Sequence, residues 1–279
     1  MYTAPPVRNA IRRRLFRWYD HFGRDLPWRR TRDPYAILVS EIMLQQTQVS
    51  RVLPAYASFL RRFPTLATLA SAPLGDVLRA WSGLGYNRRA RDLHRTAREA
   101  RRGLPRDIAG LDALPGVGAY TAGAVSCFSS GARVVFADTN IRRVLGRLVL
   151  GRTATEAEAM AIDAELLPRD AARWHHALMD LGATVCRSRA PRCDACPVAA
   201  SCRGRGTSGE ASLRKQSTFA TSDRRVRGRI VASLRERETT SVATLRRELA
   251  DERVPRLVRA LVAEGLVQRQ GLTVSLPGT

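Results

Sequence analysis

Two glycines, Gly116 and Gly118, stand two residues apart in the stretch LPGVGAYTAGAV, which covers residues 114–125. They alternate with the apolar residues Leu114 and Val117 at the start of a predicted helix. Glycine allows a tight turn and lets bare backbone N–H groups, with the positive end of the helix, approach an anion. An ordinary glycine turn between two helices is the alternative, but the full stretch favours a phosphate-binding hairpin. Such a helix-hairpin-helix binds the DNA backbone without reading its sequence.

Four cysteines form a second candidate site. Cys186, Cys193, Cys196 and Cys202 follow the spacing C-x6-C-x2-C-x5-C, so their thiolates can close around one metal centre. Zinc is the commonest centre for four cysteines, but zinc knuckles usually come as two separated C-x2-C pairs. One compact loop with unequal spacers suits a larger cubane cluster, whose ligands spread over four irons. Disulfides are the disfavoured alternative, and the fifth cysteine, Cys127, is expected in the core.

The charge of the chain indicates a polyanionic partner. Of 279 residues, 47 are lysine or arginine and 25 are acidic, which gives a formal net charge of +22. Lys215 is the only lysine, so nearly all the positive charge is arginine, which binds phosphate bidentately. No apolar run reaches the ~18–20 residues of a membrane span, and the N-terminus lacks the apolar core of a signal peptide. We therefore expect a cytoplasmic protein that binds nucleic acid and no membrane.

Helices must position these residues, because helical periodicity dominates the sequence up to the cysteine loop. A first predicted helix carries Ile11, Leu15, Trp18 and Phe22 at helical spacing. A second is predicted from Ile37 to Val49. Short segments rich in proline and glycine separate the helices, and no long run alternates with a period of two before residue 260. The sequence therefore predicts an all-α fold for this part of the chain.

The chain after the cysteine loop has a different character. Residues 203–222 are rich in glycine, serine, threonine and arginine, which is typical of a linker. Residues 223–279 predict three short helices and a β-hairpin that turns at Gln270 and Gly271. This order favours a winged-helix-like module, a fold that often binds DNA. A helical cap that packs on the main body is the alternative.

Together these motifs resemble the iron–sulfur members of the endonuclease III superfamily of base-excision DNA glycosylases, and among them the MutY-type adenine glycosylases. The segments that carry the resemblance are LPWR (26–29), SEIMLQQTQV (40–49), WSGLGYNRRARDLH (81–94), LPGVGAYTAGAV (114–125), ADTNIRRVLGR (137–147) and MDLGATVC (179–186). The resemblance implies two helical lobes with DNA between them. Residues 1–30 and 141–202 would hold a [4Fe-4S] cluster on the four cysteines, and residues 31–140 would carry the helix-hairpin-helix.

The resemblance also implies catalytic roles. Glu41 corresponds to the general acid that protonates the flipped adenine, and desolvation on its apolar helix would raise its pKa. Asp138 corresponds to the second carboxylate, which stabilises the sugar cation or bonds to it, and Asn140 would orient that chemistry. Without the motifs, a solvated glutamate and a helix-capping aspartate would be the ordinary interpretations. Tyr120 occupies the place of the Schiff-base lysine of bifunctional relatives, so the enzyme should remove a base without cutting the strand.

Further residues are assigned to DNA contact by the same resemblance. A target base must be flipped out of the duplex, and other side chains then fill the gap. Gln45 and Tyr86 match the wedge and intercalating residues of the family. Gln46 and Thr47 belong to the same pocket wall, and Arg29 would contact the base or its surroundings.

The chain departs from the family pattern at Asn87 and in the length of the part after Cys202. Asn87 stands where the family usually has a second tyrosine, and His94 is expected to be structural rather than catalytic. The chain after Cys202 is also too short for the Nudix-like domain with which many members read 8-oxoguanine.

Adenine removal has two rivals. A thymine glycosylase acting on G:T mismatches also lacks the Nudix-like domain and keeps the tyrosine, but the LQQT segment favours adenine. A non-catalytic DNA-binding protein would have no need for Glu41, Tyr120, Asp138 and Asn140 together. We therefore expect a monomer that removes adenine mispaired with 8-oxoguanine or guanine in double-stranded DNA.

Overall fold

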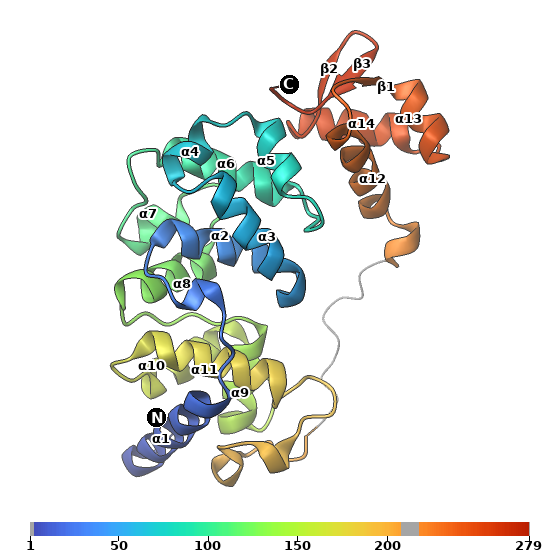
Figure 1. Cartoon of the computed structure of the whole chain (residues 1–279). Helices are drawn as coiled ribbons and strands as arrows, with labels where there is room; N and C mark the ends of the chain where they lie inside the picture. Colours follow the sequence, from blue (N-terminus) through green and yellow to red (C-terminus); the bar gives the residue numbers. More distant parts are fainter. Residues whose placement is uncertain (1–2, 208–217, 279) are drawn as a thin grey trace. The chain divides into compact units, whose positions relative to one another are not determined.

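The computed structural model describes residues 3–207 and 218–278 (Figure 1). The predicted linker, 203–222, and Lys215 lie partly or wholly outside the described residues. In residues 3–207 every regular element is a helix, which confirms the all-α prediction. The elements are α1(Pro5–Phe22), η1(Pro27–Arg29), α2(Pro34–Leu44), α3(Val49–Arg62), α4(Leu66–Ser71), α5(Leu74–Ala80), α6(Arg88–Glu99), α7(Ile108–Asp112), α8(Ala119–Ser130), α9(Thr139–Leu150), α10(Glu156–Leu166), α11(Ala171–Thr184), η2(Cys193–Ala195), η3(Ala199–Ser201), η4(Phe219–Thr221), α12(Asp223–Arg235), β1(Thr240–Ser241), α13(Val242–Leu249), α14(Val254–Ala263), β2(Gln268–Gln270) and β3(Thr273–Ser275).

The chain divides into two compact units. The first comprises residues 1–37, 107–112 and 118–213, and the second comprises residues 38–106, 113–117 and 214–279. The C-terminal module therefore belongs to the same unit as α3 to α6. The lobe boundaries predicted at residues 30 and 140 stay predictions. None of the helices in the described ranges is long and apolar enough to cross a membrane.

In the first unit, α9, α10 and α11 pack on one another, and α1 packs on α11. Ile11 and Leu15 of α1 are buried as their spacing predicts, whereas Phe22 is 66% exposed and stacks on Trp18. Phe22 is the last residue of α1, so the core ends before it. Cys127 lies fully buried, as predicted, and burial raises the pKa of its thiol to about 12.

In the second unit, α6 packs against α4 and α5, and α3 packs against α5. Trp81 and Phe59 meet edge to face in its core, with ring centroids 5.8 Å apart. His94 is buried with Nε2 2.9 Å from the carbonyl oxygen of Ala72. Burial lowers the pKa of His94, which keeps the ring neutral, and this contact agrees with the structural role predicted for it.

The predicted helix from Ile37 to Val49 is wrong at its C-terminal end. Helix α2 ends at Leu44, and α3 begins only at Val49. Between them Gln46 takes a backbone φ of 55°, in the left-handed region that ends a right-handed helix. The apolar pattern of the segment carries no sign of this break, because Val49 resumes a helical spacing after it.

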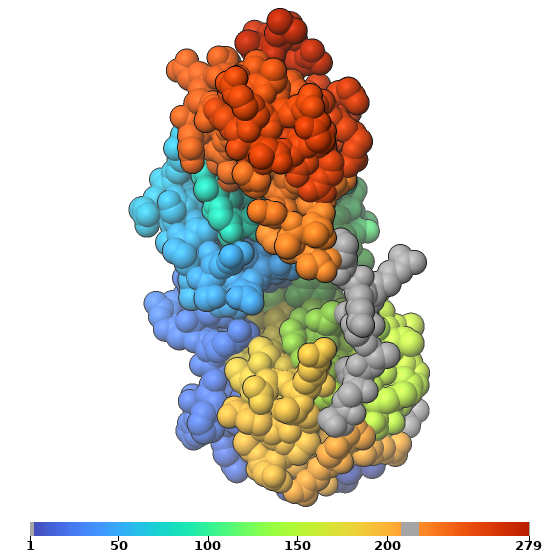
Figure 2. Space-filling view, turned by 90° about the vertical axis from the view of Figure 1, so that its right-hand side faces the viewer, coloured from blue at the N-terminus to red at the C-terminus, as the bar shows by residue number. Residues whose placement is uncertain are grey.

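The C-terminal module has the order α12, β1, α13, α14, β2, β3, and its antiparallel sheet has the strand order β1-β3-β2. This confirms the winged-helix-like prediction, but the hairpin turns one residue later than predicted, at Gly271 and Leu272, because Gln270 is the last residue of β2 and pairs with Thr273. Strand β1 was missed because two residues cannot show a period-two pattern. Residues 218–278 form a closely packed body in the space-filling view (Figure 2).

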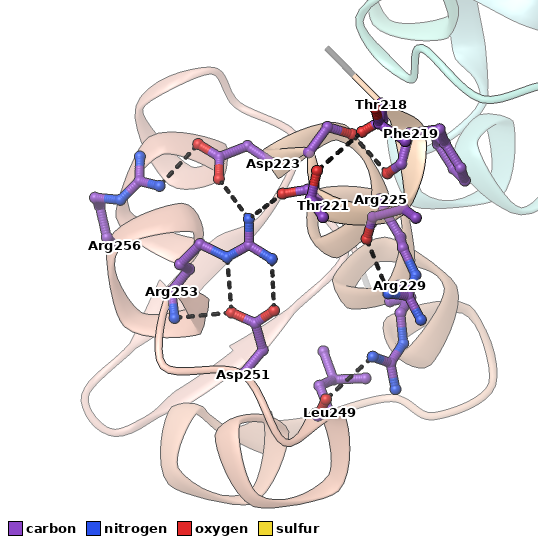
Figure 3. A network of polar contacts seen from close by, with 12 residues as sticks. Thr218, Phe219, Thr221, Asp223, Arg225, Arg229, Leu249, Asp251, Arg253 and Arg256 are labelled. Atoms are coloured by element: carbon purple, nitrogen blue, oxygen red, sulfur yellow. Dashed lines mark hydrogen bonds and ion pairs between the residues drawn. The ribbon is translucent and has the colours of Figure 1, made fainter.

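Arg253 joins separate segments of this module. The guanidinium of Arg253 donates to both carboxylate oxygens of Asp251, to the carbonyl oxygen of Thr221 at 2.8 Å and to Asp223 at 3.3 Å (Figure 3). Arg256 donates to the other oxygen of Asp223 at 2.7 Å. These bonds join the start of α12 to the turn between α13 and α14. The side-chain bond from Arg253 lowers the pKa of Asp251 to about 2.

Candidate active site and cysteine loop

The glycine hairpin has the backbone that its sequence predicts. Gly116 has a φ of 74°, and a Cβ there would lie 2.8 Å from the Cβ of Asp92, so glycine is required. Thr96 holds the preceding turn by donating to the carbonyl oxygen of Pro115 at 2.7 Å. Leu114 is half-buried and Val117 is buried, whereas both glycines are exposed, and Gly118 directly precedes α8. The exposed backbone suits phosphate contact, which stays a prediction.

The loop that carries Gln45, Gln46 and Thr47 is organised by Arg89. Its guanidinium donates to the carbonyl oxygens of Ile42 and Met43, both at 2.9 Å, and also to that of Gln45. These are carbonyls at the end of α2, which have no partner within the helix. The sequence analysis missed this role, although the arginine stands within the motif WSGLGYNRRARDLH.

Arg89 also reaches the second DNA-contact loop. Its other nitrogen donates to the hydroxyl of Thr47 and to the carbonyl oxygen of Leu84, both at 3.0 Å. Its guanidinium lies 5.4 Å from the ring centroid of Tyr86. Burial lowers the pKa of Arg89 to about 10, so the group stays charged at neutral pH. One cation therefore joins the two loops predicted to meet DNA.

Tyr86 itself is held in an unusual conformation. Its φ is 45°, a region that residues other than glycine rarely adopt, and its side chain is 41% exposed. The indole of Trp81 donates to the carbonyl oxygen of Gly85 at 3.1 Å, which fixes the preceding residue. A strained backbone and an exposed ring at one position are features of functional sites.

Glu41 lies on α2 and is only 7% exposed. Its neighbours in the helix, Leu38, Ile42 and Met43, are between 0% and 2% exposed. The solvated alternative is therefore excluded for this glutamate.

Asp138 begins a chain of hydrogen bonds in the first unit. Its carboxylate accepts from the backbone N–H of Ile141 at 2.7 Å and from the amide of Asn140 at 2.8 Å. Arg143 donates to the amide oxygen of Asn140 at 2.8 Å and to the carbonyl oxygens of Gly182 and Cys186, both at 2.7 Å. Asp138 is thus the N-cap of α9 and also one end of a network that reaches the first cysteine.

Tyr120 lies on the first turn of α8, half-buried, with its ring edge to face on Phe136 at 5.6 Å. Tyr120, Asp138 and Asn140 belong to the first unit, whereas Glu41 belongs to the second. That all four face one pocket stays a prediction.

Arg29 has a structural contact that the sequence analysis did not predict. Its side chain is 8% exposed and forms a bidentate ion pair with the fully buried Asp180, with both N–O distances 2.8 Å. Arg24 adds a third bond to the same carboxylate, from its Nε at 2.7 Å. These arginines lower the pKa of Asp180 against the opposing effect of its burial. Base contact by Arg29 stays a prediction.

The four cysteines line one hollow. Cys186, Cys193, Cys196 and Cys202 line this hollow together with Arg147, and none of the four forms a disulfide. Within residues 3–207 and 218–278, no group of three or more histidine, cysteine, aspartate or glutamate side chains is placed to hold a single metal ion. Burial, with added repulsion from the other three cysteines, raises the pKa of Cys196 to about 11.

Arg147 ties the cysteine loop to α9. It is 2% exposed, and its guanidinium donates to the carbonyl oxygens of Arg187 at 2.8 Å and Ser188 at 3.2 Å and lies 3.6 Å from the Sγ of Cys186. Its own carbonyl oxygen accepts from the N–H of Gly204 at 2.9 Å. The two ends of the loop are therefore fixed to one helix. The intervening arginines, Arg187, Arg189 and Arg192, are exposed.

Comparison with known proteins shows the family of the chain. Residues 39–169 match the model of the HhH-GPD superfamily base excision DNA repair protein. The chain is 47% identical over 228 residues to the adenine DNA glycosylase of Mycolicibacterium smegmatis, with 78% of each chain covered. It is 41% identical over 215 residues to the adenine DNA glycosylase of Homo sapiens, covering 70% of this chain and 39% of the human one.

Among solved structures, a thermostable thymine-DNA glycosylase matches with a TM-score of 0.66 and 28% identity, covering 71% of this chain and 96% of that one. Residues 39–169 thus carry a domain of the HhH-GPD superfamily of base excision DNA repair proteins. The chain belongs to the family of adenine DNA glycosylases. The MutY-type resemblance and the predicted enzyme class, a DNA glycosylase, are both confirmed.

Proposed function

We propose that this protein is a monofunctional glycosylase that removes adenine mispaired with 8-oxoguanine or guanine. The observation that carries the proposal is the state of Asp138, whose carboxylate is fixed by the N–H of Ile141 and the amide of Asn140. An anion held in advance, at the positive end of α9, is what a developing sugar cation requires. An N-cap alone would not need the further bonds that hold Asn140 in place.

Glu41 is the proposed general acid. Its burial on α2 favours a protonated carboxyl group that can donate to N7 of a flipped adenine. Protonation weakens the N-glycosidic bond, the sugar takes up positive charge, and Asp138 stabilises that charge. Tyr120 is proposed to hydrogen-bond to the intermediate. Because a tyrosine stands where bifunctional relatives have a lysine, no Schiff base forms and the strand stays intact.

The four cysteines are the proposed ligands of a [4Fe-4S] cluster. The fit rests on four soft donors around one hollow, beside the buried guanidinium of Arg147. When bound, the cluster would supply structural support to the loop that carries the exposed arginines. Arg143 and Arg147 join this loop to α9, so its order supports the position of Asp138.

The proposed partner is double-stranded DNA that contains a mispair or an oxidised guanine, bound by a monomer. The high arginine content predicts affinity that falls steeply with salt. The exposed glycine hairpin, the loop of Gln45 to Thr47, Tyr86 and Arg29 are the proposed contacts.

Single-turnover excision tests the proposal. Matched duplexes would carry adenine opposite 8-oxoguanine, guanine or thymine, and thymine opposite guanine, with alkali added to reveal abasic sites. We expect loss of adenine opposite 8-oxoguanine and guanine, with no strand break before alkali. Glu41→Gln and Asp138→Asn should each abolish it. Loss of thymine with adenine untouched would overturn the proposal in favour of a mismatch thymine glycosylase, and full activity of either variant would overturn the mechanism.

A further inference from the structure

The C-terminal module is fixed to the helices that carry the GLGY loop. Glu264, at the end of α14, accepts from Arg88 of α6 at 2.7 Å and from Arg227 of α12. Its backbone carbonyl oxygen accepts from Arg91 of α6 at 2.6 Å. The N–H of Gly75 in α5 donates to the carbonyl oxygen of Pro277 at 2.7 Å. The module is therefore bound to α5 and α6 by direct hydrogen bonds and ion pairs.

Helix α12 then reaches the loop itself. Arg235 donates through Nε to the carbonyl oxygen of Leu78 at 2.8 Å and through Nη2 to the side-chain oxygen of Asn87 at 3.0 Å. Arg224 donates through Nη1 to the phenol oxygen of Tyr86 at 3.1 Å. The two arginines are about three helical turns apart, so one face of α12 serves two consecutive residues of the loop. Asn87 is also the position at which the sequence departs from the family pattern.

Tyr86 is thereby constrained at three points. Its backbone is in the left-handed region, Arg89 lies against its ring, and Arg224 binds its hydroxyl. An exposed tyrosine would otherwise lose rotamer freedom when it enters DNA, which weakens binding. A ring held in place beforehand avoids that loss.

We propose that Arg224 is a positioning residue for Tyr86, through which the C-terminal module takes part in recognition of the mispair. The proposal rests on the intercalating role assigned to Tyr86 under the proposed function. This contact gives the C-terminal module a role in the reaction, although the module does not have the Nudix fold. Arg224 acts through the phenol of Tyr86, so its effect depends on that hydroxyl being present.

A double-mutant cycle on DNA affinity tests this. Arg224→Ala and Tyr86→Phe remove the two partners of one hydrogen bond, and the double variant removes both. The measurement is the dissociation constant for a duplex with adenine opposite 8-oxoguanine, made with an uncleavable adenine nucleotide so that binding is read without excision. We expect each single variant to weaken binding by about two- to tenfold, and the double variant to be no weaker than the worse single one.

Two further variants test whether the loss of affinity comes from this contact or from the removal of one positive charge. Arg225→Ala removes the same charge from the neighbouring residue, which is exposed and whose side chain, among the contacts described, bonds the carbonyl oxygen of Ala220 at 3.0 Å. We expect it to weaken binding by less than Arg224→Ala. Arg224→Lys keeps a donor for the phenol and should restore part of the affinity, and the thermal midpoint of every variant should match that of the parent.

The outcomes are distinct. Additive effects of Arg224→Ala and Tyr86→Phe, or equal effects of Arg224→Ala and Arg225→Ala, would overturn the inference. Failure of the parent protein to excise adenine would overturn the proposed function instead, because the binding cycle does not depend on excision. Non-additive loss with an unchanged thermal midpoint supports the positioning role.

Discussion

Replacement of Arg89 by methionine tests whether one cation orders both predicted DNA-contact loops of the second unit. Methionine keeps an unbranched apolar stem but leaves the carbonyls of Ile42, Met43 and Leu84 without their donor. Ile42 and Met43 are at most 2% exposed, so water cannot easily replace the guanidinium. A hydrogen bond to a charged group contributes about 1.5–3 kcal/mol, and bonds from one guanidinium do not add fully. The expected loss is therefore about 3–5 kcal/mol of unfolding free energy.

For a chain of this size, about 2–4 °C of thermal midpoint corresponds to each kcal/mol, so Arg89→Met should lower the midpoint by about 6–20 °C. Arg95→Ala on the same helix is the matched control. Its guanidinium is 57% exposed and faces Glu99 at 4.0 Å, so the change should be under about 1 kcal/mol. Differential scanning calorimetry provides the comparison. A midpoint for Arg89→Met within about 2 °C of the parent would refute the argument that Arg89 satisfies the end of α2.

Four other predictions have defined outcomes. Gly116→Ala should cost about 1–2 kcal/mol in urea unfolding, because its φ is 74° and its Cβ would meet Asp92. Gly118→Ala should change the unfolding free energy by less than about 0.5 kcal/mol, since no described atom lies within 4 Å of its Cβ. The same variant should weaken DNA binding, because the hairpin is proposed to contact phosphate. Arg143→Gln should slow single-turnover excision by about 10- to 100-fold while the protein stays folded, because Asn140 loses its support. Burial lowers the pKa of His176 to about 3. Below about pH 6.5 the unfolded chain therefore binds a proton at this histidine, whereas the folded protein does not. The unfolding free energy should fall by up to about 2 kcal/mol between about pH 7 and pH 5. His176→Phe, measured by urea unfolding at the two pH values, should remove that part of the dependence.

Strongly periodic features of the fold could be predicted from the sequence. The buried spacing of Ile11 and Leu15 identified α1, and the apolar stripe of the last helix with its following hairpin identified the winged-helix-like module. Breaks that depend on a single backbone angle could not be predicted. Gln46 leaves the helix at a φ of 55° with no glycine or proline to announce it, and β1 pairs through only two residues.

In the candidate site, the motifs identified the residues that can carry out the chemistry, but not the residues that hold them in place. Glu41, Tyr120, Asp138 and Asn140 were found because they stand in specific segments. Arg89 was missed because a surface-like arginine pattern does not reveal that its guanidinium is directed at carbonyl oxygens. The contact between Arg224 and Tyr86 joins residues 138 positions apart, and no local pattern could predict it.

Asp138 has two tasks that a pair of substitutions can separate. As the N-cap of α9 it must accept from the N–H of Ile141, and asparagine performs that task about as well as aspartate. As the proposed stabiliser of the sugar cation it must carry a negative charge, which asparagine lacks. Asp138→Asn should therefore keep the cap and lose only the bond from the Asn140 amide, at a cost of about 0.5–1.5 kcal/mol, while excision is lost.

Asp138→Ala should lose both, with a stability cost of about 0.5–2 kcal/mol from the missing cap. Urea unfolding and single-turnover excision on the same two variants provide the comparison. If Asp138→Asn proved as unstable as Asp138→Ala, its inactivity would say nothing about charge, and the assignment of a catalytic role would have to rest on Glu41 alone. A stable and inactive asparagine variant would instead show that α9 is capped by the residue that performs the chemistry, so that the helix and the reacting centre are positioned by the same two hydrogen bonds.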